Sequence, residues 1–93
     1  MEYISVIWKH QNDREPVRLV SELDAARFER RKLEFFADGS VGFADDVHED
    51  PRTMLGTVAV PPLSQINDDP QFDGVSITQN EFNQLWGEHA SGA

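Results

Sequence analysis

Cysteine is absent from the 93 residues of this chain. Disulfide bridges and thiolate metal sites are therefore excluded, and the fold must be held together by packing and hydrogen bonds. A chain of this length buries enough surface for one hydrophobic core without cross-links. We therefore expect a single domain over residues 1–93, in a reducing compartment such as the cytoplasm.

Long apolar runs are also absent from the sequence. No stretch approaches the roughly 20 apolar residues that a membrane-spanning helix needs. The first ten residues lack the basic start and the long apolar centre of a signal peptide. The sequence thus predicts no membrane contact and a cytoplasmic location.

Basic residues are few. Eight Lys and Arg stand against seventeen Asp and Glu, which gives a net charge of −9. A surface of this sign repels nucleic acid and anionic lipid, so we expect the chain to bind neither. It attracts a basic protein, although the same charge also serves solubility alone.

The clearest structural signal is a β-hairpin within residues 28–46. Glycine adopts a positive φ at low cost and aspartate bonds to its own turn, so Asp38-Gly39 predicts a tight turn. The two strands are expected at residues 28–36 and 40–44.

Two further details of the hairpin follow from its side chains. Neither face of the first strand is wholly apolar, and a bulge near Arg30 and Arg31 would bring Phe28 and Leu33 to one face. In the return strand, Gly42 leaves room for a neighbouring side chain or backbone.

Period-two alternation predicts three more strands, at residues 2–10, 17–23 and 53–60. In the first of these, Ile4, Val6 and Trp8 share the face that we expect to turn toward the core. Residues 75–77 predict a short extended piece near the end of the chain.

Helical signals follow the strands. A short helix is predicted over residues 62–67, and Thr78 with Glu81 forms the pattern of a capping box. The helix after this box carries Phe82, Leu85 and Trp86 on one apolar stripe, and residues 91–93 should fray. The predicted fold is α+β, an antiparallel β-meander of four to five strands with two short C-terminal helices packed on one face.

Catalytic and metal-binding patterns are weak. The acidic stretch around His48 offers oxygen donors and one imidazole, but it lacks the glycine turn and ligand spacing of an EF-hand. No serine stands in a nucleophile motif. We therefore expect a protein that is not an enzyme, with no catalytic residue, no metal and no cofactor.

Half of the basic residues lie in one run, which consists of Arg27, Arg30, Arg31 and Lys32. A nucleic-acid site there would oppose the net charge of the chain. We instead expect cross-strand ion pairs with nearby glutamates, namely Glu22, Glu29 or Glu34.

The best candidates for partner contact are acidic. One group is the loop after the hairpin, with Asp45, Asp46, Glu49 and Asp50, and a second consists of Asp68 and Asp69. Carboxylates placed this close repel one another, and a basic partner would relieve the repulsion. A solvated loop without a partner is the alternative for each group.

Several segments together resemble a bacterial family of small acidic proteins, a domain of unknown function. They are Tyr3-Ile4-x-Val6-x-Trp8, Glu15-Pro16-Val17, Ser21-Glu22-Leu23-Asp24, Arg31-Lys32-Leu33-Glu34-Phe35-Phe36-x-Asp38-Gly39, Gly42-Phe43-Ala44, Ile66-Asn67-x-Asp69-Pro70-x-Phe72 and the helix from Thr78 to Trp86. Such a family looks like the immunity proteins of bacterial toxin systems. The resemblance implies a cytoplasmic protein that neutralises a cognate toxin, such as a nuclease or deaminase with a basic cleft, and it implies no catalytic residue.

A second hypothesis belongs to another class. The chain could be a non-catalytic accessory or self-associating domain that forms a homodimer through an uncovered sheet face. The residues expected on that face are Tyr3, Ile7, Val20 and Phe36.

Overall fold

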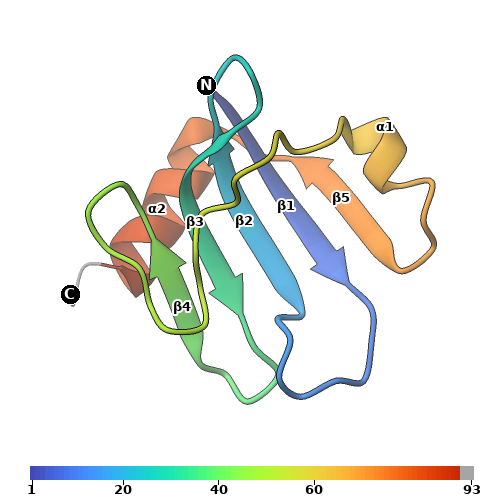
Figure 1. The fold of residues 1–93 in the computed structure, drawn as a ribbon, viewed down its shortest axis with the longest axis horizontal. Helices are drawn as coiled ribbons and strands as arrows, with labels where there is room; N and C mark the ends of the chain where they lie inside the picture. The colour runs from blue at the N-terminus through green and yellow to red at the C-terminus, as the bar shows by residue number, and fades with distance from the viewer. Residues whose placement is uncertain (91–93) are drawn as a thin grey trace.

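The computed structural model describes residues 1–90 and contains a five-stranded antiparallel sheet and two helices (Figure 1). Along the chain these are β1 (Glu2–Trp8), β2 (Arg18–Leu23), β3 (Glu29–Phe35), β4 (Val41–Ala44), α1 (Leu63–Ile66), β5 (Phe72–Ser76) and α2 (Gln79–His89). The predicted α+β fold with an antiparallel sheet is confirmed. The end that was expected to fray, residues 91–93, lies outside the described residues.

The first four strands form a meander, and the chain then returns to add β5 beside β1. The order across the sheet is β4-β3-β2-β1-β5. Ser5 of β1 therefore has a cross-strand partner on each side, Val20 in β2 and Val75 in β5. The outer strands of the sheet are β4 and β5.

The hairpin of β3 and β4 has the predicted turn and the predicted bulge. Gly39 has a φ of 89°, and the carboxylate of Asp38 accepts a hydrogen bond from the Ser40 N–H at 2.9 Å. Arg30 is the extra residue of β3 at the point where its register with β2 shifts. Local sequence signals were therefore sufficient to define this element.

Helix α2 covers one face of the sheet. Its Phe82 is fully buried in a cluster with Tyr3, Val20 and Leu33. The helix begins at the predicted capping box. The side chain of Thr78 accepts a hydrogen bond from the Glu81 N–H, and the carboxylate of Glu81 accepts one from the Thr78 N–H. The cap thus places the apolar stripe of α2 against the sheet.

The opposite face of the sheet is buried as well. Ile4 and Val6, on the expected core side of β1, form a second cluster that includes Leu63 and Ile66 of α1. The two helices therefore lie on opposite faces, and their expected placement on one face is wrong. The reason is that neighbouring residues of β1 point to opposite sides, and both sides are apolar.

The face proposed for self-association is not open. Tyr3, Val20 and Phe36 are all buried, whereas Ile7 remains 42% exposed. Helix α2 covers Tyr3 and Val20, and the guanidinium of Arg52 lies 4.0 Å from the ring centroid of Phe36. The set of four residues predicted for a homodimer interface is therefore wrong.

The strand predicted at residues 53–60 is also wrong. Residues 53–62, called the strap below, cross the face opposite α2 on the way from β4 to α1 (Figure 1). Only Thr53 takes part in an isolated β-bridge among the described residues of the strap. Several backbone groups of the strap bond instead to side chains of the sheet, as when the Gly56 N–H donates to Glu29.

Gly42 is the point where the strap meets β4, which confirms the expected close approach. A Cβ at this position would lie 2.1 Å from the Oγ1 atom of Thr53. Thr53 itself is fully buried and donates its hydroxyl to Glu34 at 2.9 Å. The absence of a side chain at Gly42 therefore allows the strap to start in this position.

Replacing Gly42 tests this packing. We expect Gly42→Ala to lower the free energy of unfolding in urea by about 1–3 kcal/mol, because the added methyl group overpacks the Thr53 contact. Gly87→Ala is the matched control, since a Cβ there meets nothing within 4 Å. In a helix interior it should raise the stability by about 0.5–1 kcal/mol. Equal stability of Gly42→Ala and the wild type would contradict the proposed contact.

A partly buried ion pair lies beneath α2. The guanidinium of Arg31 donates to Glu22 through two hydrogen bonds of 2.8 Å and lies 4.8 Å from the ring centroid of Phe82. The hydroxyl of Tyr3 donates to the same carboxylate at 3.0 Å. The Arg31 hydrogen bonds hold the pKa of Glu22 below its usual value, whereas burial raises the pKa of Tyr3.

The lowered pKa predicts a pH dependence of stability. The stabilisation from ionised Glu22 is complete above the unfolded-state value of 4.5 and is lost as the pH falls through the lower pKa of the folded state. Urea unfolding at several values between pH 6.5 and pH 3 measures this loss. Glu22→Gln should lower the stability at neutral pH and flatten the acidic part of the profile. An unchanged slope in this variant would rule out Glu22 as a source of the pH dependence.

Candidate functional site

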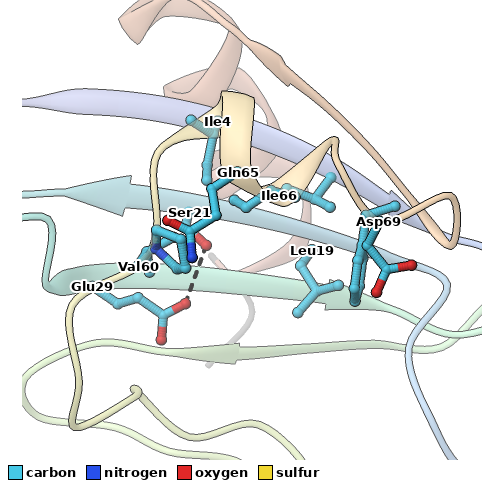
Figure 2. A pocket seen from close by; sticks show the side chains of 11 residues that line it. Ile4, Leu19, Ser21, Glu29, Val60, Gln65, Ile66 and Asp69 are labelled. Carbon is cyan, nitrogen blue, oxygen red and sulfur yellow. Dashed lines mark hydrogen bonds between the residues drawn. The ribbon is translucent and has the colours of Figure 1, made fainter.

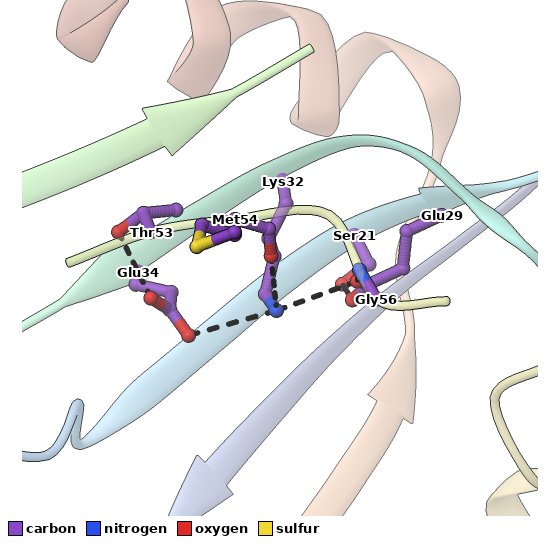
Figure 3. Close-up of polar contacts among 7 residues, drawn as sticks. All are labelled: Ser21, Glu29, Lys32, Glu34, Thr53, Met54 and Gly56. Carbon is purple, nitrogen blue, oxygen red and sulfur yellow. Dashed lines mark hydrogen bonds and ion pairs between the residues drawn. The ribbon is translucent and has the colours of Figure 1, made fainter. Parts of the chain in front are cut away.

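A polar network holds the strap on the sheet (Figure 3). The ammonium group of Lys32 lies 3.3 Å from Glu29 and 3.7 Å from Glu34, and it donates to the Met54 carbonyl at 3.2 Å. Glu29 also accepts the Gly56 N–H at 2.6 Å. Side chains of β3 thus replace the neighbouring strand that the strap lacks.

The network contains more negative than positive charge. The side chains of Glu29, Lys32 and Glu34 are only 8–12% exposed, and the two carboxylates share one ammonium group. Hydroxyl groups offset part of this imbalance, since Ser21 donates to Glu29 at 3.3 Å and Thr53 donates to Glu34. One buried negative charge nevertheless lacks a cation within this network.

The expected cross-strand pairing is confirmed for Arg31, which pairs with Glu22 of β2. Lys32 also pairs with two of the expected glutamates, but both of them, Glu29 and Glu34, belong to its own strand. A third, Arg27, pairs with Glu2 and donates to the carbonyl groups of residues 60 and 61 of the strap. The run is therefore largely occupied within the fold, although Arg30 is exposed.

A pocket of about 400 Å³ lies between the strap, α1 and the sheet (Figure 2). It is lined by Ile4, Val6, Leu19, Ser21, Glu29, Val60, Pro61, Gln65, Ile66, Asp69 and Phe72. Most of these side chains are apolar. Among the described residues, none that lines the pocket is a Lys, Arg or His.

Carboxylates mark the two ends of the pocket. In Figure 2 the carboxylate groups of Glu29 and Asp69 lie at opposite ends, with Leu19 and Ile66 between them. Glu29 is the inner end, because its side chain is almost buried. Asp69 is exposed and stands at the mouth. The pocket can therefore hold an elongated apolar group that carries a positive charge.

The acidic loop divides into structural and exposed residues. Asp45 accepts hydrogen bonds from the N–H groups of Val47 and His48 at 2.9 and 2.8 Å. Asp50 accepts from the Phe43 N–H at 2.8 Å, and this bond lowers the pKa of its carboxyl. These two carboxylates therefore serve the loop itself.

The remaining acidic candidates are exposed to solvent. Asp46 and Glu49 follow β4, while Asp68 and Asp69 precede β5. Because β4 and β5 are the outer strands, the two groups of carboxylates belong to opposite edges of the sheet. The structure does not bring them together, and only Asp69 lines the pocket.

The pocket was not predicted, because the alternation within residues 53–60 indicates a strand, whereas these residues form the strap. One signal was present, since Lys32 and Glu34 alternate with apolar residues in the third of four meander strands. When an inner strand of a sheet carries charged residues on one face, those residues need polar partners above that face. Those partners are strap residues such as Thr53.

Other kinds of site receive no support from the described part of the chain. Residues 1–90 contain no group of three or more His, Asp or Glu side chains placed to hold a metal ion. No helix within these residues is long and apolar enough to cross a membrane.

The fold and the pocket define a small α+β domain in which a strap covers one face of an antiparallel sheet. The chain belongs to the DUF6881 family, a domain of unknown function, whose model matches residues 2–91. No curated protein and no solved structure matches the chain.

The division within the acidic loop is testable. Asp50→Ala removes the acceptor of the Phe43 N–H and should lower the free energy of unfolding by about 1–2 kcal/mol. Asp46→Ala, in the same loop but exposed, should change it by less than about 0.5 kcal/mol. Both values come from urea unfolding at pH 7. Similar losses in the two variants would show that Asp50 has no special structural role.

Proposed function

We propose that this chain is an immunity-type binding protein that neutralises a cognate bacterial toxin with a basic surface, and that it acts in the cytoplasm. The observation that supports this proposal is the charge left after internal pairing. Among residues 1–90, three of the eight Lys and Arg pair with four of the seventeen acids, so five cations remain against thirteen acids. The acidic excess is therefore mainly a property of the surface.

In this proposal, the toxin contacts the surface around Asp68 and Asp69. Asp69 lines the mainly apolar pocket, and Asp68 is its exposed neighbour. A second pocket, of about 430 Å³, lies beside the acidic loop, but Asp46 and Glu49 do not line it. A nuclease or deaminase toxin needs a cationic cleft to hold nucleic acid. An acidic domain seated on that cleft excludes the substrate by occupying the same positive charge.

Self-association has less support. Two apolar side chains near the outer edge of the sheet at β5 are exposed: Ile7 of β1 is 42% exposed and Val75 of β5 is 53% exposed. The middle of that edge is already bonded, because the side chain of Asn67 both donates to and accepts from the backbone of Gly74. A second copy could not pair along β5 without displacing Asn67.

The test is co-expression with the protein encoded by the neighbouring gene. We expect a complex that survives gel filtration at low salt, relief of toxicity, and an affinity that falls as the salt concentration rises. The double variant Asp68→Lys with Asp69→Lys should raise the Kd at least about tenfold, by replacing attraction with repulsion.

Two further double variants serve as comparisons. Asp13→Lys with Glu15→Lys makes the same change of charge on an exposed loop away from the pocket and should alter the Kd by less than about threefold. Asp46→Lys with Glu49→Lys reports on the other edge of the sheet. A larger effect there than at residues 68 and 69 would move the contact to the acidic loop. Failure to form any complex and to relieve toxicity would reject the proposed function.

A further inference from the structure

We propose that the pocket under the strap binds the side chain of a lysine from the protein partner, with its alkyl stem along the apolar walls and its ammonium group at Glu29. The nature of the partner rests on the proposed function above. The binding chemistry rests on the pocket itself.

The charge of the network around Lys32 favours a bound cation. Glu29 and Glu34 share the single ammonium group of Lys32 in a nearly buried position. A buried carboxylate without a cation of its own is unfavourable. The pocket leads to Glu29 from outside, and no described residue that lines it brings a positive charge. A cation entering from the partner would balance the network.

The shape of the pocket suits a lysine side chain. The walls between the two carboxylates are aliphatic, with Leu19 and Ile66 between Glu29 and Asp69 (Figure 2). A lysine stem of four methylene groups packs well against such a surface while its head group reaches a polar end. Asp69 at the mouth attracts the same cation during its approach.

The hydrogen bonds of the Glu29 carboxylate favour lysine over arginine. The Oε1 atom of Glu29 is already bonded to the Gly56 N–H and to Lys32, and its Oε2 atom has only the Ser21 hydroxyl at 3.3 Å. Arginine binds carboxylates best through both oxygens at once. A compact ammonium group needs one oxygen, so the free capacity at Oε2 favours lysine.

The experiment uses the full chain and a small probe. Nα-acetyl-lysine N-methylamide is titrated into the ¹⁵N-labelled protein while amide shifts are followed by NMR. We expect saturable shifts at Val6, Leu19 and Ile66 with a Kd of about 1 mM, the range for a fragment of this size. The norleucine analogue, which lacks the ammonium group, should bind at least about fivefold more weakly, and the arginine analogue should also bind less well. Absence of saturable shifts, or equal binding of lysine and norleucine probes, would overturn the proposal.

Variants locate the ammonium group. Glu29→Gln should weaken the lysine probe about tenfold, but it also alters the bonds that hold the strap. Asp69→Asn leaves those bonds intact and should weaken the probe about two- to threefold. Asp13→Asn is the matched control, because this exposed carboxylate does not line the pocket, and it should leave the Kd unchanged. Equal effects of the variants at 13 and 69 would show that the mouth is not where the cation passes.

The two proposals can fail separately. The probe titration needs no toxin, so lysine binding is measured even if no complex forms with the neighbouring gene product. If a complex forms but the probe does not bind, the partner contacts the surface without filling the pocket. That result would reject the lysine site and keep the proposed function.

Discussion

The position of the strap depends on one shared ammonium group. Lys32 lies between Glu29 and Glu34 and also bonds to the strap backbone at Met54. Without this interaction, two carboxylates would face each other beneath a segment that lacks a β-ladder of its own. Breaking such a buried network by removing one partner is strongly destabilising, because the remaining charges are left without compensation. This network holds the first half of the strap, and Arg27 bonds to the carbonyl groups of Val60 and Pro61, the strap residues that line the pocket.

The sheet is therefore covered on both faces by different means. On one face α2 buries Phe82 against apolar residues, and the charged pair of Arg31 and Glu22 lies under aromatic rings. On the other face, α1 packs its Leu63 and Ile66 against an apolar cluster of the sheet, and the strap is held by hydrogen bonds between side chains and its backbone. Those bonds leave an opening between strap and sheet, whereas the close packing beneath α2 fills the space. The apolar pocket lies in this opening.

Local signals predicted the parts of the fold that depend on nearest neighbours. The turn at Asp38-Gly39, the bulge at Arg30 and the capping box at Thr78 each follow from the conformations that a few adjacent residues prefer. The strap was missed because apolar residues such as Val58 suggest a strand, and no local rule tells whether a neighbouring strand will be present. Val58 is in fact 73% exposed. The acidic candidates lie outside the helices and strands, as expected, but Asp45 and Asp50 bond to backbone groups of their own loop and of β4.

The sequence by itself determined the class of the fold, the order of the meander and the sign of the surface charge. These follow from alternation, turn residues and composition, which are properties of short segments or of the whole chain. Only the tertiary structure decided that the helices lie on opposite faces, that two glutamates share Lys32, and that Glu29 and Asp69 end one pocket. These residues are 40 positions apart in sequence, and their placement depends on how the strap crosses the sheet. Contacts at such separation arise from competition among packing arrangements, which local patterns do not encode.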